Sequence, residues 1–392
     1  MIPYGRQSVD QRDADAVLDV LRGDWLTQGP TVERFERAVA ERVEAAHCIA
    51  FSSGTAALHA ATAVTGLGPG DTVVTSPLTF MASANCARYV GATPALLDLD
   101  PDTWNLDVRA MPSGMDALVA VHYAGLPVDL RAVRNRPAVV IEDAAHALGA
   151  ATPSGPVGNC AHSDLCCFSL HPVKPITSGE GGLVTTNDGE LAERLRRFRS
   201  HGVEPDPDRG GWAYRIASLG FNYRMTDLHA ALGLSQLARL DAFIDRRNEL
   251  AERHRSALVG TGVGLPPVAP SGFRHGHHLF VVHVRHRRRV YERLRAAGIG
   301  VQVHYVPVHH HPISADITLP PDGLPVCEWV YDGVLSLPLF PSLTEADQDR
   351  VIEVLRRTVD ELAGLTDEPV RAGAPVPAAA PVPAVAVAGV RR

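Results

Sequence analysis

The sequence predicts an α/β protein whose larger part is built on a mostly parallel β-sheet. Over roughly the first two hundred residues, short apolar or β-branched runs alternate with segments of helical spacing, as where CIAFSS precedes GTAALHAATAV. Runs such as AVVI and ALVAV are apolar at successive positions, which is typical of parallel strands covered on both faces. Later the pattern changes to HHLFVVHV, YERLRAAG and IGVQVHYVPV, which indicates a second, smaller α+β unit.

The predicted elements follow in chain order. Apolar residues at helical spacing mark helices over 13–22 and 31–43. Seven strand-like runs come next, and helical patterns follow the first two of them. The runs cover 48–53, 72–77, 92–100, 117–123, 138–144, 166–170 and 181–187, with the helices at 54–64 and 79–90. A long helical pattern covers 226–259, and a last helix is expected near 344–363.

We expect two domains and a tail. The large α/β domain covers 1–250, the small C-terminal α+β domain covers 251–365, and residues 1–14 are a candidate to pack with the small domain. The tail at 366–392 is an Ala/Pro/Val sequence without aromatic residues or periodicity, so we expect it to be disordered.

Composition excludes several classes of function. The chain of 392 residues is 21% charged and 45% hydrophobic with a net charge of −7, so neither nucleic acid nor an anionic membrane is an expected partner. No run of about 18 apolar residues occurs and the N-terminus has no apolar signal core, so we expect a cytoplasmic protein. The cysteines form no CxxC pair, and the adjacent Cys166 and Cys167 lie in an apolar run typical of buried thiols.

Three motifs fall at the carboxyl ends of predicted strands, where open α/β sheets bind their ligands. Ser53, Gly54 and Thr55 open a helix whose free amides suit an anion such as phosphate, although a plain N-cap explains them as well. Asp143 ends the AVVI strand and could cap a helix, bind a metal ion or pair with a protonated ring nitrogen. Lys174 stands between prolines in HPVKPITSGEGG, which hold its backbone extended, and the glycines after it permit tight turns.

An amine, an anion site and a strand-end carboxylate together match the requirements of pyridoxal 5'-phosphate (PLP). This cofactor needs an amine for its Schiff base, a phosphate site, and an acid that keeps its pyridine nitrogen protonated. Burial beside a cationic ring would lower the pKa of Lys174 so that it can attack, and the displaced amine could then move a proton between two carbons. The three motifs therefore predict a PLP-dependent enzyme.

The chain resembles the DegT/StrS-type sugar-nucleotide aminotransferases, a branch of the fold-type I PLP-dependent aminotransferases. The resemblance runs from about IPYGRQSV to LPLFPSLT, which is nearly everything except the tail. It implies that Lys174 forms the Schiff base and that Asp143 is the ring-nitrogen acid. It also implies that Phe80 stacks on the pyridine ring and that His146 lies near the phenolic oxygen. Phosphate contacts are implied for Gly54, Thr55, Ser169 and Asn222, the last reaching the cofactor of the neighbouring subunit.

Within the family, HPVKPITSGEGG and HYVPVHHHP look closest to enzymes that aminate UDP-4-keto-6-deoxy-N-acetyl-altrosamine, with L-glutamate as donor, on the way to pseudaminic acid. Other readings are an aminotransferase for another keto sugar or cyclitol of natural-product or surface-glycan biosynthesis, and a PLP-dependent sugar dehydratase. Dehydratases of this family have histidine at the lysine position, so Lys174 argues against the last reading. The candidate substrate contacts are Trp25, Thr27, His171, Tyr223, Arg224, His304, Tyr305 and His309.

Two other classes are disfavoured. A carbon–sulfur lyase would share the fold and the cofactor but would lack NYRMTD and HYVPVH. A regulator that had borrowed the fold would have lost the lysine or gained a DNA-binding domain.

Two further features bear on assembly and on metals. The stretch 202–220 is Gly-rich and polar, and the helical pattern after it has apolar faces that suit a two-fold contact, so we expect a homodimer with shared active sites. His309, His310 and His311 stand in a row. Because adjacent side chains on an extended chain point in opposite directions, we expect no metal site there.

Overall fold

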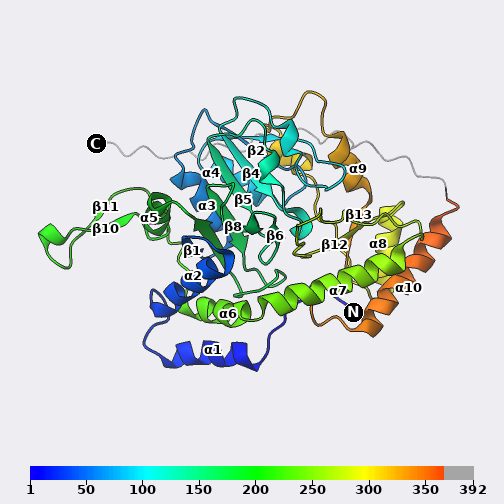
Figure 1. The fold of residues 1–392 in the computed structure, drawn as a ribbon, viewed down its shortest axis with the longest axis horizontal. Coiled ribbons are helices and arrows are strands. Elements are labelled where there is room, and N and C mark those ends of the chain that lie inside the picture. The colour runs from blue at the N-terminus through cyan, green and yellow to red at the C-terminus, as the bar shows by residue number, and fades with distance from the viewer. Residues whose placement is uncertain (366–392) are drawn as a thin grey trace.

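The computed structural model of the protein describes residues 1–365, so the predicted disordered tail lies outside the described residues. Figure 1 shows a central sheet flanked by helices, with a smaller C-terminal unit beside it. The α-helices are α1 (Gln11–Arg22), α2 (Pro30–Val43), α3 (Gly54–Val64), α4 (Ala82–Tyr89), α5 (Gly189–Phe198), α6 (Asp227–Leu237), α7 (Leu240–Leu258), α8 (Arg287–Ala296), α9 (Pro325–Gly333) and α10 (Glu345–Leu362). The strands are β1 (His47–Phe51), β2 (Thr72–Thr75), β3 (Thr93–Leu96), β4 (Ala117–Val121), β5 (Val139–Asp143), β6 (Ala151–Thr152), β7 (Gly155–Pro156), β8 (Leu165–Ser169), β9 (Gly182–Thr186), β10 (Val203–Pro205), β11 (Tyr214–Ile216), β12 (Phe280–His283) and β13 (Val334–Leu337).

The seven predicted strands form one seven-stranded sheet in the order β1-β9-β8-β5-β4-β2-β3. β9 is antiparallel to both of its neighbours, and the other neighbouring strands of this sheet are parallel. The predicted α/β class with a mostly parallel sheet is therefore confirmed. Because β1, β4, β5 and β8 run in one direction, the chain leaves all four at the same edge of the sheet.

Alternate residues of the strands enter different apolar cores, as the two-residue period of a strand requires. In β1, Cys48 and Ala50 pack with α2, α6 and the start of α7, whereas Ile49 and Phe51 pack with α3, α4 and α5. Helices thus cover both faces of this sheet, which explains why its strands are apolar at successive positions.

The prediction of one long helix over 226–259 is wrong, because two helices occupy this segment. α6 ends at Leu237 and α7 begins at Leu240, with Arg239 outside helical geometry between them. The Arg239 guanidinium forms ion pairs with Asp10, which caps α1, and with Asp13 in the first turn of α1. We attribute the break to these tertiary contacts, which the local sequence pattern does not contain.

Helix α7 belongs to two apolar cores. Leu240 and Ile244 at its start pack against the large sheet, whereas Leu250 and Leu258 pack with β12, β13, α8 and α10. The expected domain division near residue 250 therefore falls inside a continuous helix rather than in a linker.

The N-terminal residues also contact both units. The amide of Ile2 donates to the carbonyl of Gly298 at 2.9 Å, and the carbonyl of Tyr4 accepts from the amide of Leu339 at 3.0 Å. Helix α1 instead packs on α6 of the large unit. Only the first few residues of the 1–14 segment thus pair with the small unit.

A β-hairpin projects from the large unit at the left of Figure 1, where β10 and β11 pair antiparallel. It lies within the stretch that the sequence marks as Gly-rich and polar. Its surface nevertheless carries large apolar side chains, since Trp212 is 84% exposed and nearby Leu219 is 80% exposed. Such side chains on a projecting arm are typical of a contact with another molecule.

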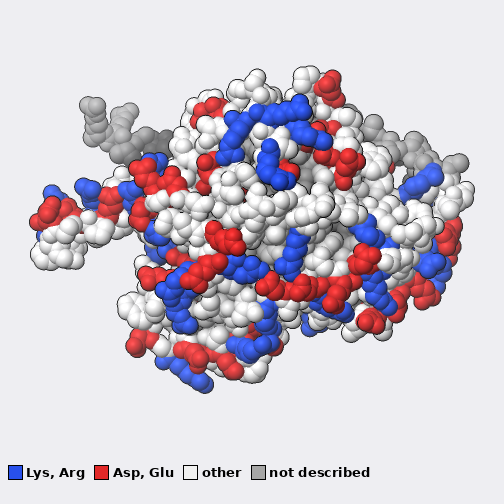
Figure 2. Space-filling view, viewed as in Figure 1, with Lys and Arg blue, Asp and Glu red and all other residues white. Residues whose placement is uncertain are grey.

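Charged residues of both signs are distributed over the face drawn in Figure 2. On the face drawn in Figure 2, charges of both signs alternate along α7 and α10, and the pair Arg253–Asp349 joins these helices at 2.7 Å. No helix within residues 1–365 is long and apolar enough to cross a membrane. All six cysteines are buried and unpaired, which confirms the prediction for Cys166 and Cys167.

Candidate active site

A cavity of about 560 Å³ lies where the strands of the large sheet end. The segments after β1, at the end of β5 and at the end of β8 supply Ser53, Asp143 and Ser169 to its wall. The N-terminal segment and the later part of the chain complete the wall with Tyr4, His278, His304 and Tyr305. The cavity therefore occupies the position at which open α/β sheets bind ligands.

The N-terminus of α3 meets the end of β8 at one side of this cavity. The Ser53 hydroxyl caps the helix by accepting from the amide of Ala56 at 3.1 Å. The amides of Gly54 and Thr55 remain available, because the first residues of a helix have no i−4 carbonyl within it. A Cβ atom on Gly54 would lie 2.9 Å from the Cβ of Ser169, so only glycine permits this approach. The N-cap and the anion site are therefore compatible.

The predicted extended backbone at Lys174 is wrong, because Lys174 lies on the turn that follows β8, where its amide donates to the carbonyl of His171 at 2.9 Å. Its side chain is partly buried in the cavity wall. Burial lowers the pKa of its amine to about 8, against a smaller opposing effect of Asp143. An amine with this pKa is partly neutral at neutral pH, and the neutral form is the one that acts as a nucleophile. Lys174 is also the only lysine of the 392-residue chain.

Asp143 is a buried carboxylate whose two oxygens are both held. Its Oδ2 accepts from the hydroxyl of Ser83 at 2.6 Å, and its Oδ1 accepts from the amide of Ala145 at 3.1 Å. The Ser83 hydroxyl also contacts that of Thr79 at 2.8 Å. No α-helix of residues 1–365 begins directly after Asp143, so this residue is not a helix cap, and its carboxylate lines the cavity.

Aromatic side chains in the wall contact one another. His146 Nε2 is hydrogen-bonded to the Tyr305 hydroxyl at 2.9 Å, and the His278 ring lies 4.4 Å from that of His146. His304 Nδ1 is bonded to the hydroxyl of Ser336 at 2.8 Å. Burial lowers the pKa of all three imidazoles, that of His304 to about 4, so they are neutral at neutral pH.

The structure brings most of the predicted cofactor residues to this wall. Phe80 is 61% exposed there, with its ring 6.1 Å from that of Tyr305. Other predicted residues that line the wall are Gly54, Thr55, Asp143, His146, Ser169, His171, Lys174 and His304. Sequence reasoning missed Tyr4, Thr79, His278 and the Ser83 that holds Asp143.

Several predicted residues do not line the cavity. Tyr223 lies in an aromatic cluster, where its hydroxyl is bonded to Nδ1 of His59 at 3.1 Å and its ring stacks on Phe221. Asn222 is exposed and pairs with Ser200 through a single β-bridge. The other predicted residues outside the wall are Trp25, Thr27, Arg224 and His309.

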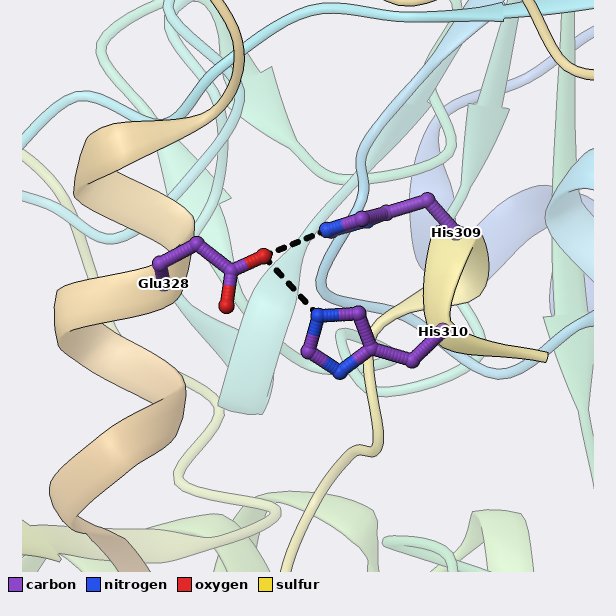
Figure 3. A group of neighbouring side chains, drawn as sticks. All are labelled: His309, His310 and Glu328. Carbon is purple, nitrogen blue, oxygen red and sulfur yellow. Dashed lines mark hydrogen bonds and ion pairs between the residues drawn. The ribbon is translucent and has the colours of Figure 1, made fainter. Parts of the chain in front are cut away.

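His309 and its neighbour His310 converge instead on Glu328 of α9, as Figure 3 shows. Their Nε2 atoms lie 2.5 and 2.9 Å from the same carboxylate oxygen. The expectation that adjacent histidines diverge is wrong for this pair, because Val308–His310 form a 3-10 turn rather than an extended chain.

Residues 7–356 match the model of the DegT/DnrJ/EryC1/StrS aminotransferase family, and the chain belongs to this family. The spore coat polysaccharide biosynthesis protein SpsC of Bacillus subtilis is 36% identical over 379 residues, or 91% of this chain and 97% of that protein. PseC of Helicobacter pylori, an aminotransferase involved in the biosynthesis of pseudoaminic acid, superposes with a TM-score of 0.85 at 28% identity, covering 92% and 99% of the two chains. Spr1654 of Streptococcus pneumoniae is assigned as a sugar aminotransferase and was solved in its PMP form. It superposes with a TM-score of 0.87 at 26% identity, covering 92% of this chain and 100% of that chain.

The enzyme is a PLP-dependent transaminase, as its family is, which confirms the predicted cofactor. Two observations show that the wall fits this group. Nδ1 of His146 is buried without a partner within residues 1–365, and the lack of a side chain at Gly54 lets the N-terminus of α3 approach Ser169 closely at the cavity. The residues that would hold PLP are Gly54, Thr55 and Ser169 at the phosphate, Asp143 at the ring nitrogen, His146 and Phe80 at the ring, and Lys174 at the reactive carbon.

The charge and protonation state of each side chain determine its chemical role in the site. When bound, PLP supplies a ring that accepts electrons from the bond that breaks at the amino acid. Asp143 would hold a proton on the ring nitrogen of the bound cofactor. Lys174, with a pKa of about 8, can accept a proton from one carbon and return it to another. The neutral His304 adds no competing charge beside this amine.

We predict that the enzyme without cofactor captures PLP covalently at a rate that rises with pH through about 8. Only the neutral amine of Lys174 attacks, and burial lowers its pKa from 10.5 to about 8. Stopped-flow absorbance should show roughly a tenfold increase in rate from one unit below to one unit above that pKa. A rate that stays low until pH approaches the ordinary lysine value would contradict the lowered pKa.

We also predict that Asp143→Asn lowers the turnover number on the order of 100-fold while weakening PLP binding much less. The amide keeps the shape of the side chain but removes the charge that retains the ring proton. Ser83→Ala is the matched control, because it removes the 2.6 Å hydrogen bond and keeps the carboxylate. Steady-state kinetics and PLP titration separate the two effects, and an Asn variant with normal turnover but poor PLP retention would make Asp143 only a positional contact.

Proposed function

We propose that the enzyme transfers the amino group of L-glutamate to the 4-keto group of UDP-4-keto-6-deoxy-N-acetyl-altrosamine. The observation that carries this proposal is that two segments, HPVKPITSGEGG and HYVPVHHHP, both contribute to the cavity wall. They supply His171 and Lys174 from the first and His304 and Tyr305 from the second. The similarity to PseC supports a substrate from the biosynthesis of pseudoaminic acid.

The cavity suits a substrate larger than an amino acid. Its volume of about 560 Å³ is in the range of sites for ligands of sugar size or more. Its wall contains no arginine from residues 1–365, and its one lysine is Lys174. The carboxylates of L-glutamate and a nucleotide diphosphate need cations. We therefore infer that some cationic contacts come from outside this wall.

A homodimer would supply such contacts. Arg224 follows the exposed Asn222 in NYRMTD, and neither lines the cavity of its own chain. The projecting hairpin with exposed Trp212 and Leu219 is the surface best suited to a second subunit. The α6 faces that the sequence suggested for this contact already pack on α1 and α2. We propose that residues 222–224 of one subunit reach the active site of the other, in a cytoplasmic homodimer.

The alternative is that the substrate is a different keto sugar. SpsC, the spore coat polysaccharide protein, favours a sugar of a surface polysaccharide. A dehydratase is less well supported, because Lys174 occupies the position that those enzymes give to histidine.

A panel of 4-keto and 3-keto nucleotide sugars, each incubated with L-glutamate and read by mass spectrometry, tests the proposed substrate. We predict that the altrosamine derivative is aminated with a kcat/KM at least about tenfold above that of its C-4 ketone relatives. Amination of only 3-keto sugars would contradict the proposed substrate but would leave the transaminase assignment intact.

Mixed dimers test the shared site. We predict that Lys174→Ala and Asn222→Asp, each inactive alone, regain activity when co-expressed, because one site of each mixed dimer has both defects and the other has neither. Random pairing should restore about a quarter of the wild-type activity. The added charge of the aspartate repels the phosphate and makes the single variant inactive.

The matched control is a mixture of Lys174→Ala with Asp143→Asn. Both residues line the cavity of the same chain, so every site of that mixed dimer keeps one defect and activity should stay low. Failure of the first mixture, with mixed dimers shown by mass spectrometry of intact complexes, would contradict the shared site.

A further inference from the structure

Two imidazoles and one carboxylate converge outside the catalytic cavity. His309 Nε2 and His310 Nε2 lie 2.5 and 2.9 Å from Oε1 of Glu328, and the three atoms are all within 4.8 Å of one another (Figure 3). Two imidazole nitrogens thus lie within hydrogen-bond distance of one oxygen, although the side chain of Glu328 is 47% exposed and has a second oxygen.

The segments that carry these side chains are firmly anchored. The amide of Val308, which begins the 3-10 turn, donates to the carbonyl of Pro77 at 2.8 Å. Asp98 accepts from the amides of Val326 and Cys327 at 2.9 Å and so caps the start of α9. Val308 and Cys327 are fully buried in the same apolar cluster. The backbone therefore fixes the distance between the histidine turn and the helix that carries the glutamate.

We propose that His309, His310 and Glu328 form a binding site for a divalent transition-metal ion of the zinc class. Two imidazole nitrogens and one carboxylate oxygen are a ligand set that zinc accepts, with a fourth position left for water. Ligand atoms of a tetrahedral zinc site are separated by roughly 3.3 Å, given bonds near 2.0 Å. The ion would therefore need Glu328 to withdraw by less than about one ångström, which its exposed side chain can do.

The site has a structural consequence for the active-site wall. His309 follows Tyr305 by four residues, and Tyr305 lines the catalytic cavity. An ion bound here would join the segment that continues from Tyr305 to α9. Hard cations such as magnesium prefer oxygen ligands and should bind this set poorly.

Equilibrium dialysis of the untagged, PLP-loaded enzyme against zinc, followed by elemental analysis, tests the site. We expect the wild type to hold one more zinc per chain than Glu328→Gln or His310→Ala, whose affinity should fall at least about tenfold. His311→Ala is the matched control: its histidine adjoins the pair but lies outside the group, so this variant should bind as the wild type does.

Thermal unfolding gives an independent readout. Zinc, but not magnesium, should raise the Tm of the wild type and of His311→Ala by a few degrees and leave that of Glu328→Gln unchanged. Glu328 and His310 are both exposed. Tm values without zinc that equal that of the wild type will show that Glu328→Gln and His310→Ala fold. Equal zinc uptake by the wild type and Glu328→Gln, or an equal loss in His311→Ala, would overturn the proposal and leave a hydrogen-bonded cluster.

Discussion

The active site depends on burial of the Lys174 amine in the cavity wall that it shares with Asp143. The carboxylate accepts hydrogen bonds from two neutral donors, the Ser83 hydroxyl and the Ala145 amide, and keeps acceptor positions for a further donor. Burial then dominates the pKa of the lysine and lowers it to about 8, although Asp143 acts in the opposite direction. A free Asp143 that paired with the amine would hold it protonated and unreactive.

The fold supplies this arrangement in two ways. Parallel strands bring the N-terminus of α3, the carboxylate of Asp143 and the turn that carries Lys174 to one edge of the sheet, and Gly54 and Gly182 permit their close approach. A Cβ on Gly182 would lie 2.2 Å from the carbonyl oxygen of Ser53, so any residue other than glycine would clash with the backbone there. The buried Arg247 of α7 donates to backbone carbonyls of both His278 and Leu339 at 3.3 and 2.9 Å, and thereby ties the later part of the wall to the large unit.

Much of this could be predicted from the sequence, because it rests on local patterns. Strands that are apolar at successive positions, and motifs at strand ends, locate the sheet and its active edge. The break at Arg239, the contact of Ser83 with Asp143 and the place of His278 depend on residues distant in sequence, which no local pattern contains. The convergence of His309 and His310 depends on a 3-10 turn that the extended reading of HYVPVHHHP missed. One available signal was overlooked, namely that a chain rich in arginine retains a single lysine.

That single lysine makes the central claim directly measurable. Borohydride reduces a carbon–nitrogen double bond between an amine and PLP and so fixes the cofactor to the residue that holds it. Peptide mass spectrometry of the reduced enzyme should find one phosphopyridoxyl group per chain, on the peptide that carries Lys174, and none in Lys174→Ala. Attachment at any other residue, or a fully active enzyme whose cofactor remains unattached after reduction, would contradict the account.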